Sequence, residues 1–155
     1  MLTKLIQPKA KLALPSANNS EALMLAIYRW QIGTVALLLA DSRIDPAVNN
    51  NEAIRDVVHY NYIGVVKLLL ADSRVDPSAE NNEAIRWASY LGYAEIVKLL
   101  LADSRVNPAA LDNEAIRYAS RSGHTKVVRL LLTDSRVVSL MERSGVENVC
   151  IGGNK

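Results

Sequence analysis

Apolar and polar residues follow a pattern along this chain that returns at a constant distance. The clearest copy runs from Asn82 to Pro108, NEAIRWASYLGYAEIVKLLLADSRVNP, and its periodicity predicts two short amphipathic helices that meet at a glycine. Closely similar copies begin at Asn51 and Asn113, and a more divergent one begins at Ser20. The glutamates after these positions are 31 residues apart, at Glu21, Glu52, Glu83 and Glu114. A fixed period of about 20–50 residues indicates a solenoid of stacked repeats.

The two predicted helices of each copy differ in how much of their surface is apolar. In the first helix, Ile85, Ala88 and Ser89 recur at helical spacing and predict a narrow stripe of small side chains facing the second helix. The second helix carries IVKLLLA, VVRLLLT or a relative, and its leucine triplet is apolar on more than one side. We therefore expect it to be buried by its partner helix and by the next copy.

Polar residues and glycines predict where these helices begin and end. Asn51, Asn82 and Asn113, with Ser20 in the first copy, are expected to cap the first helix through bonds to its free backbone N–H groups. At the turn between the helices, Gly92, Gly123 and Asn61 suit the left-handed conformation. Trp30 stands at this position in the first copy and predicts a turn of a different shape. Asp76-Pro77 and its equivalents close the unit, because proline disfavours helix in the residue before it.

The ends of the array differ from its interior. Leu5, Ile6 and Pro15 lie one period before Ala36, Leu37 and Pro46, so residues 1–19 predict a capping remnant in which residues 2–18 cover the first repeat. After Met141 the repeating pattern stops, which predicts a short helical remnant at most within a tail, 141–155. The predicted repeats are 20–49, 50–80, 81–111 and 112–140.

Composition and charge exclude several classes of protein. Half of the 155 residues are hydrophobic, which argues against disorder across the repeats. The net charge of +2 is spread over interspersed residues, so we expect no nucleic-acid partner. No apolar run approaches the length of a membrane span, so we expect no membrane partner either. The single cysteine, Cys150, and the absence of a signal-peptide pattern predict a cytoplasmic, intracellular protein.

The residues that catalysis requires are scarce. His59 and His124 are two repeats apart, and Cys150 lies in the tail, so no nucleophile, base and orienting group are predicted to converge. A zinc site needs more ligands than these, and no glycine-rich phosphate loop occurs. We therefore expect no enzyme activity, no cofactor and no metal.

The order helix, turn, helix and returning loop, with A-x-x-x-G before E-I-V-K-L-L-L, resembles the ankyrin repeat over residues 20–140. The common ankyrin repeat has about 33 residues and begins T-P-L-H-x-A, whereas this one has 31 and begins N-E-A-I-R-x-A. The shorter loop lacks a glycine, so its β-finger is expected to be reduced to a tight turn. The resemblance implies an all-α ankyrin-repeat solenoid of stacked helix-turn-helix pairs. The sequences NEAIRxAS and LLLxDSRVDP also resemble ankyrin proteins of large DNA viruses that infect amoebae, and of their hosts.

Positions that repeat between copies are the ones that stacking requires, and positions that vary are free to serve a partner. Arg55, Arg86 and Arg117 repeat, each three residues after a glutamate. They predict exposed ion pairs within one helix, worth ~0.2–0.5 kcal/mol, or else a basic stripe for an acidic partner. Aspartate and arginine columns, such as Asp103 and Arg105, are expected to neutralise each other in the loops.

The variable positions of the first helix are rich in aromatic residues. In the ankyrin architecture they lie on the concave face, opposite the stripe of small side chains. We predict that this face binds a partner through five aromatics and four flanking arginines: Tyr28, Tyr60, Trp87, Tyr90 and Tyr118, with Arg29, Arg55, Arg86 and Arg121. The alternative is that these rings merely pack on their neighbours. The turn residues Trp30, Tyr62, Tyr93 and His124 are assigned to the scaffold, His124 through a hydrogen bond.

The expected partner is another protein that presents a helix or an extended peptide with acidic and apolar residues together. If the origin is viral, that partner is a host factor. The protein is expected to be a monomer or to self-associate weakly. The alternative function is a structural solenoid that assembles end to end.

Overall fold

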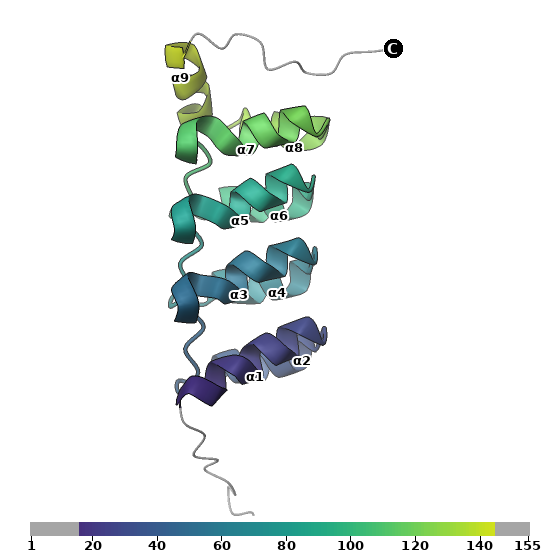
Figure 1. Ribbon diagram of the computed structural model, residues 1–155, viewed down its shortest axis with the longest axis vertical. Coiled ribbons are helices and arrows are strands. Elements are labelled where there is room, and N and C mark those ends of the chain that lie inside the picture. The colour runs from purple at the N-terminus through teal and green to yellow at the C-terminus, as the bar shows by residue number, and fades with distance from the viewer. Residues whose placement is uncertain (1–15, 145–155) are drawn as a thin grey trace, which may run out of the picture.

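The computed structural model describes residues 16–144, which form nine α-helices and no strand. Eight of these helices make four successive pairs, and the pairs stack in a column with the ninth helix at its C-terminal end (Figure 1). The helices are α1 (Ser16–Tyr28), α2 (Ile32–Ala40), α3 (Val48–His59), α4 (Ile63–Ala71), α5 (Ala79–Tyr90), α6 (Ala94–Leu101), α7 (Ala110–Arg121), α8 (Thr125–Leu131) and α9 (Ser135–Ser144). The predicted all-α solenoid of helix-turn-helix pairs is confirmed.

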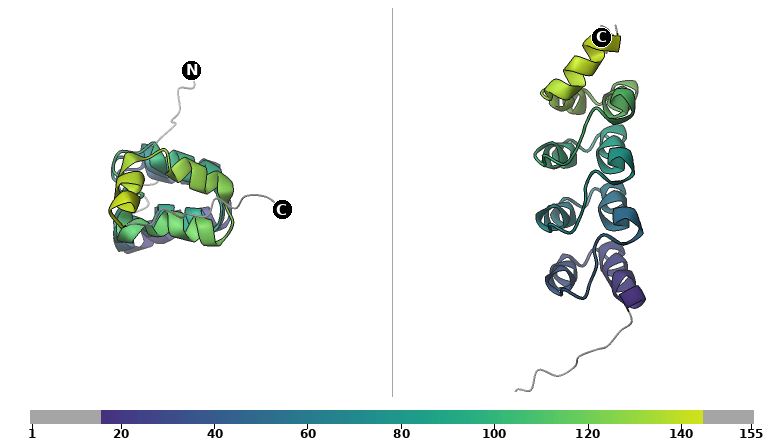
Figure 2. Two further views of the ribbon diagram at one scale, coloured as in Figure 1. Left: turned by 90° about the horizontal axis from the view of Figure 1, so that it is seen from above. Right: turned by 90° about the vertical axis from the view of Figure 1, so that its left-hand side faces the viewer.

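The core runs along the whole stack instead of gathering at one centre. The first helices α1, α3, α5 and α7 form one layer and the second helices α2, α4, α6 and α8 form the other (Figure 2). Ile85 and Ala88 of α5 are fully buried, as the stripe of small side chains predicts. Leu100 in the middle of its leucine triplet is also fully buried, and Leu99 and Leu101 on either side are half-buried. Each pair therefore contributes one layer to a continuous apolar column.

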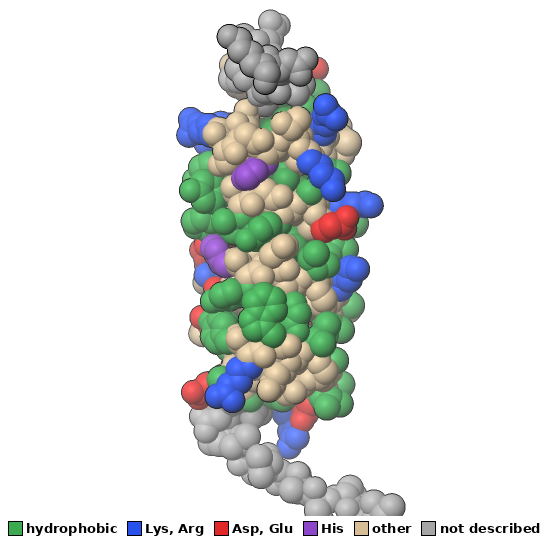
Figure 3. Space-filling view, turned by 90° about the vertical axis from the view of Figure 1, so that its right-hand side faces the viewer, with side chains coloured by type: hydrophobic (Ala, Val, Ile, Leu, Met, Phe, Trp, Pro, Cys, Tyr) green, Lys and Arg blue, Asp and Glu red, His purple; other side chains and the backbone are tan. Residues whose placement is uncertain are grey.

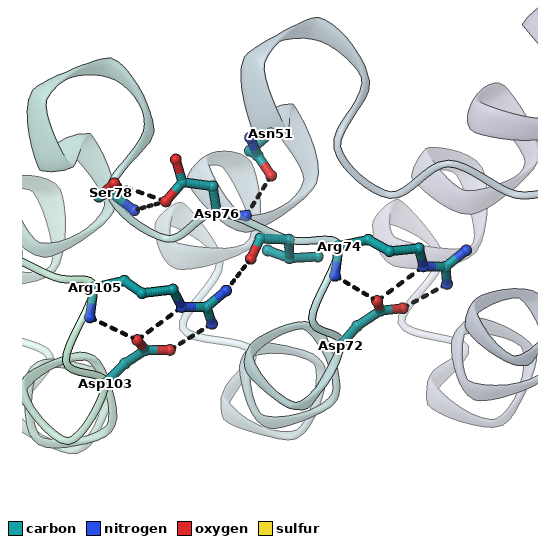
Figure 4. A network of polar contacts seen from close by, with 8 residues as sticks. Asn51, Asp72, Arg74, Asp76, Ser78, Asp103 and Arg105 are labelled. Atoms are coloured by element: carbon teal, nitrogen blue, oxygen red, sulfur yellow. Dashed lines mark hydrogen bonds and ion pairs between the residues drawn. The ribbon is translucent and has the colours of Figure 1, made fainter.

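The asparagines before the first helices do not cap them as predicted. Near the start of α3, α5 and α7, three consecutive residues take the left-handed conformation, and seven of these nine are Asn or Asp. Asparagine is one of the few residues besides glycine that adopts this conformation routinely. The Oδ1 of Asn82 accepts the backbone N–H of Asn107 at 2.6 Å, and Asn51 accepts that of Asp76 at 2.7 Å (Figure 4). These side chains therefore join each pair to the loop that follows it.

The Asp-Ser-Arg loops are held by a repeated set of polar contacts. Arg105 donates from Nε and from its backbone N–H to Asp103, at 2.9 and 3.0 Å (Figure 4). Its Nη1 donates to the carbonyl of Val75 in the preceding loop at 2.5 Å. The N–H of Val106 bonds back to the carbonyl of Asp103 at 3.1 Å, so the chain makes the expected tight turn here. The Asp and Arg columns therefore neutralise each other and also link successive loops.

The turn between the two helices has the same left-handed residue in all four pairs. Its φ angle is 59° at Trp30, 51° at Asn61, 77° at Gly92 and 74° at Gly123. The prediction of a differently shaped first turn is therefore wrong. Stacking fixes the path of this turn, so the backbone of Trp30 follows its neighbours although a bulky residue disfavours that conformation.

At the N-terminal end, α1 begins at Ser16, so residues 16–19 extend the first helix instead of belonging to a separate remnant. Residues 1–15, the main part of the predicted cap, lie outside the described residues. Leu37 of α2 is 75% exposed, whereas its equivalents in the later pairs are half-buried. The difference arises because, among the described residues, no earlier helix pair lies beside α2.

At the C-terminal end, α9 occupies the place of the next loop and runs through the predicted boundary at residue 140. It begins at Ser135, earlier than the expected remnant after Met141, and its Val137 is buried. The N–H of Val138 bonds within the helix to Asp134, so it is not available to Asn113. The Asn113 amide donates instead to the carbonyl of Val137 at 2.9 Å, and its Oδ1 is buried without a partner.

Candidate interaction surface

Two of the repeated arginines of the first helices form ion pairs with the first helix of the next repeat. Arg55 of α3 pairs with Glu83 of α5, and Arg86 of α5 pairs with Glu114 of α7. The expected i,i+3 pairs within one helix are therefore wrong for Arg55 and Arg86. Sequence spacing reports neighbours on one helix, whereas these partners come together because stacked helices lie side by side.

The same arginines also bind the left-handed turns. Arg55 donates from Nη1 to the carbonyls of Asn49 and Asn50, each at 3.1 Å. Arg86 donates from Nε to the carbonyl of Asn81 at 3.1 Å. Both side chains are half-buried, with their hydrogen-bonding groups directed into the scaffold. A role for them in binding a partner stays a prediction, and this geometry supports a structural role.

The first and last helix pairs each lack one member of the arginine–glutamate ion pair. Between the first and second helix pairs, buried Met24 stands where the arginine would be. In the last pair, Arg117 is exposed, and position 145, where a fifth glutamate would fall, is a glycine. Within residues 16–144, two of the three junctions between pairs therefore carry this interaction.

Aromatic side chains of the first helices form a row of ring contacts that reaches all four pairs. Tyr28 meets Tyr60 with ring centroids 5.9 Å apart, and Tyr90 meets Tyr118 at 5.7 Å. Between them, Trp87 lies 5.6 Å from Tyr90 and 4.9 Å from His59, the residue next to Tyr60. We call these six residues the aromatic row: Tyr28, His59, Tyr60, Trp87, Tyr90 and Tyr118.

The rings of the aromatic row pack on one another and still face solvent. Tyr28, Tyr60 and Tyr90 are 43%, 46% and 45% exposed, and Trp87 and Tyr118 are half-buried. The structure therefore brings the five predicted aromatics together along the first-helix layer. The same side chains therefore pack on their neighbours and remain exposed to a partner. From the sequence, these are two alternatives.

Hydrogen bonds hold the polar ends of these aromatics. The hydroxyl of Tyr28 donates to Asp56 Oδ2 at 2.8 Å, and this bond, more than burial, raises the pKa of Tyr28 far above its usual value. Trp87 donates from Nε1 to Glu83 at 3.2 Å. Burial favours a raised pKa for Glu114, but hydrogen bonds from Arg86 and Tyr118 outweigh it and lower the pKa of that carboxyl. The hydroxyls of Tyr28 and Tyr118, whose pKa values are both raised by hydrogen bonds to carboxylates, therefore stay neutral.

Two predicted arginines flank the aromatic row at opposite ends of the stack. Arg29 lies at the end of α1 and Arg121 at the end of α7, and both are exposed. Neither has a side-chain ion pair or hydrogen bond to another residue in the described part of the chain. They are therefore cations available to an acidic group from outside.

The sequence matches the family model described as ankyrin repeats in three copies over residues 52–140, more than half of the chain. The protein belongs to the ankyrin-repeat family. Ankyrin repeats are generally non-enzymatic modules for protein–protein interaction. No curated protein matches the sequence. The resemblance to viral ankyrin proteins stays a prediction.

In this ankyrin stack, most of the turn aromatics serve the scaffold. The Tyr62 hydroxyl donates to the Trp30 carbonyl at 2.7 Å, and His124 Nε2 lies 2.9 Å from the Tyr90 carbonyl oxygen. The predicted scaffold hydrogen bond of His124 is confirmed. Tyr62 and Tyr93 are half-buried.

Trp30 differs from the other turn aromatics, because its side chain is 54% exposed. Its assignment to the scaffold stays a prediction, and its position in the turn does not indicate this exposure. The available signal was that the first copy alone has neither glycine nor asparagine at this position.

Other kinds of site find little support in the described ankyrin stack. Within residues 16–144, no three His, Cys, Asp or Glu side chains gather closely enough to hold a metal ion. None of the described helices combines the length and apolar character needed to span a membrane. A cleft of about 410 Å³ lies between Asn107–Ala109 and α9, and it contains none of the predicted site residues.

Proposed function

We propose that this ankyrin-repeat protein is a non-enzymatic interaction module whose four repeats, residues 20–140, bind a partner helix or peptide through the first-helix face. The observation that carries this proposal is the aromatic row. It reaches all four helix pairs and keeps three tyrosines almost half exposed. These positions vary between copies whose neighbouring residues repeat, which separates them from the requirements of stacking.

The dimensions of the row suit a short protein segment. Stacked helices lie ~8–10 Å apart, so four pairs give a surface about 30 Å long. A helix of ~20 residues has that length. Each aromatic side chain covers ~150–250 Å² when it is fully buried. Because the five predicted aromatics are already partly buried in the stack, they supply part of the ~800 Å² that one partner contributes to a standard interface, and the residues around them supply the rest.

The charges beside the row favour an acidic partner. Arg29 and Arg121 are exposed and have no acidic side chain paired with them in residues 16–144. Complementary charge raises the rate of association and selects against basic partners. Because Arg55 and Arg86 are engaged by glutamates of the stack, we assign the attraction to Arg29 and Arg121. The proposed target therefore carries acidic and apolar residues together.

We place this interaction inside the cell, where a protein with one cysteine has no need of a disulfide. If the chain is viral, a host protein is the proposed target. These two points rest on the sequence alone.

The test uses peptides selected from a random phage-displayed library against the full chain. The double variant Tyr28→Ala/Tyr90→Ala should weaken their binding by about tenfold or more, because aromatic residues dominate interface energies. The matched control Lys67→Ala/Lys98→Ala changes two exposed residues of the second-helix layer and should leave the affinity unchanged. Equal binding by both variants, or failure to select any peptide, would argue against the proposed face.

A second candidate function is an end-to-end assembly of copies, and exposed Leu37 at the N-terminal end of the stack is the observation that favours it. Size-exclusion chromatography with light scattering over a range of concentrations discriminates the two. Assemblies that grow with concentration and disappear in Leu37→Lys would support stacking. A constant monomer mass would remove this candidate and leave the interaction module.

A further inference from the structure

The starting observation is the backbone of Trp30. This residue has a φ of 59°, in a turn where the later pairs have asparagine or glycine. A left-handed conformation disfavours a bulky side chain, and such outliers persist only where the surrounding structure imposes them. Here the Tyr62 hydroxyl donates to the Trp30 carbonyl at 2.7 Å, which fixes the strained peptide.

Neighbouring residues cover the Trp30 side chain only in part. The centroid of its ring lies 4.7 Å from that of Tyr62 and 6.4 Å from that of Tyr60. Even so, 54% of the residue is exposed. Glycine at this position would keep the turn and remove an exposed apolar group. A large ring at a strained and exposed position is therefore a candidate contact for a partner.

Trp30 extends the aromatic row into a broader surface at its N-terminal end. Tyr28 touches Tyr60, and Tyr60 touches Trp30, so the three exposed rings are contiguous above half-buried Tyr62. We call Tyr28, Trp30 and Tyr60 the Trp30 patch. Hydrophobic side chains gather toward the N-terminal end of the side on which the helices of each pair are joined (Figure 3). Trp, Tyr and Arg are the residues most enriched among the energetic anchors of interfaces.

The charges at this patch determine which partner it fits. Arg29 lies between Tyr28 and Trp30 in the chain, is exposed, and makes no ion pair in the described structure. The nearby acid Asp56 is half-buried and already accepts the Tyr28 hydroxyl at 2.8 Å. The exposed charge at the patch is therefore the positive charge of Arg29.

We propose that the Trp30 patch is the principal anchor of the interaction surface and takes a bulky apolar side chain that stands beside an acidic residue in the partner. This inference rests on the proposed function and makes it more specific, because it assigns the main contact to the first two helix pairs. The apolar side chain packs on Trp30 and Tyr60, and the adjacent carboxylate reaches Arg29. The remainder of the aromatic row then contributes less to affinity.

Trp30→Gly is the test variant, because it installs the residue that the third and fourth pairs have at this turn. It should melt at the same or a higher temperature and bind the phage-selected peptides at least about tenfold more weakly. Trp30→Asn copies the second pair and gives the same test if Trp30→Gly does not fold. Asn61→Gly is the matched control at the same turn position and should bind normally. Selected peptides should carry Asp or Glu next to an aromatic residue or leucine.

The outcomes separate this inference from the proposed function. One outcome is that the peptide affinity of Trp30→Gly stays within twofold of the natural protein, whereas Trp87→Ala/Tyr90→Ala binds more weakly. In that case the Trp30 anchor is wrong and the first-helix face stands. If neither variant loses affinity, both proposals fall. A spectroscopic test uses Trp87→Phe, which leaves Trp30 as the only tryptophan. Its emission should shift to shorter wavelength when a selected peptide binds, and an unchanged spectrum would overturn the inference.

Discussion

The guanidinium of Arg86 on α5 pairs with the carboxylate of Glu114 on α7, in the next helix pair. Each of these side chains is only 17% exposed. The arginine also donates to the carbonyls of Glu80 and Asn81, so one side chain joins a helix, a left-handed turn and the following pair. Residues that repeat with the period of the stack are therefore used between repeats as much as within them.

Removing this arginine should destabilise the stack. Arg86→Met leaves Glu114 without its cation and should lower the free energy of unfolding by ~1.5–3 kcal/mol, the usual range for a hydrogen bond to a charged group. Arg117→Met is the matched control, because Arg117 is exposed at the end of the series, and it should change stability by less than about 0.5 kcal/mol. Urea denaturation measures both. Equal losses would contradict a role between pairs.

The asparagine that ties each pair to the following loop can be tested in the same way. Asn82→Ala removes the acceptor of the Asn107 N–H and should cost ~1–3 kcal/mol. Asn81→Ala is the control, because Asn81 has the same left-handed backbone but is exposed. The difference in unfolding free energy between the variants isolates the side-chain bond. If they lose the same amount, the backbone conformation alone explains the asparagine.

Two turn glycines should respond differently to the same substitution. Both Gly92 and Gly123 have positive φ, so alanine should cost about 1–2 kcal/mol at either position. At Gly92 a Cβ would also lie 2.6 Å from Nδ1 of His124, whereas at Gly123 it would meet nothing within 4 Å. Gly92→Ala should therefore lower the melting temperature further than Gly123→Ala. Adding His124→Ala should remove the excess, and equal melting temperatures for the two single variants would refute the clash.

Acid should lower the free energy of unfolding by protonating the aspartates of the Asp-Ser-Arg loops. Hydrogen bonds from Arg105 outweigh burial and hold the pKa of Asp103 below its ordinary value of 3.8. The pKa of Asp103 is lower in the folded protein than in the unfolded chain. The carboxylate therefore contributes fully to stability above the unfolded pKa, and this contribution is lost as the pH falls through the folded pKa. The free energy of unfolding should therefore fall as the pH drops through 3.8 and below it.

Asp103→Asn should make that pH dependence shallower, because the substituted side chain does not titrate. Urea denaturation across the acid range compares the variant with the natural protein. The control is Asp112→Asn, an exposed site for which the described structure shows no side-chain hydrogen bond or ion pair. An identical slope in the natural protein and in Asp103→Asn would show that the loop carboxylates contribute nothing to acid sensitivity.

We propose that the N-terminal segment covers the exposed side of the first pair, as the sequence predicts. Deleting residues 2–15 should lower the melting temperature by several degrees or reduce solubility, because the outer side of the first pair would lose its proposed cover. A melting curve unchanged by the deletion would rule out this cap.

The period, the helix pairing and the left-handed residues Asn61, Gly92 and Gly123 could be predicted from the sequence, because residue type and spacing along the chain determine them. The apolar stripe through Ile85 and Ala88 follows from helical spacing alone. The partners of Arg55 and Asn82 could not be predicted in this way. Each partner lies at least 25 residues further along the chain, and only the offset between stacked pairs brings it near.

The candidate surface could likewise be predicted only in part. Comparing the four copies separated varying from repeating positions and identified Tyr28, Tyr60 and Tyr90, which the structure leaves exposed. The exposure of the Trp30 ring could not be predicted, because a position in a turn does not determine which way a side chain points. The comparison also counted Arg86 as available, since sequence does not show whether a charge is already paired.

The most direct test of the account is to map, by amide chemical shifts in NMR spectra, where a phage-selected peptide contacts the full chain. We expect the largest changes on the exposed side of α1, α3 and α5, centred on Tyr28, Trp30 and Tyr60. Changes confined to α2, α4, α6 and α8, or to the Asp-Ser-Arg loops, would contradict this expectation.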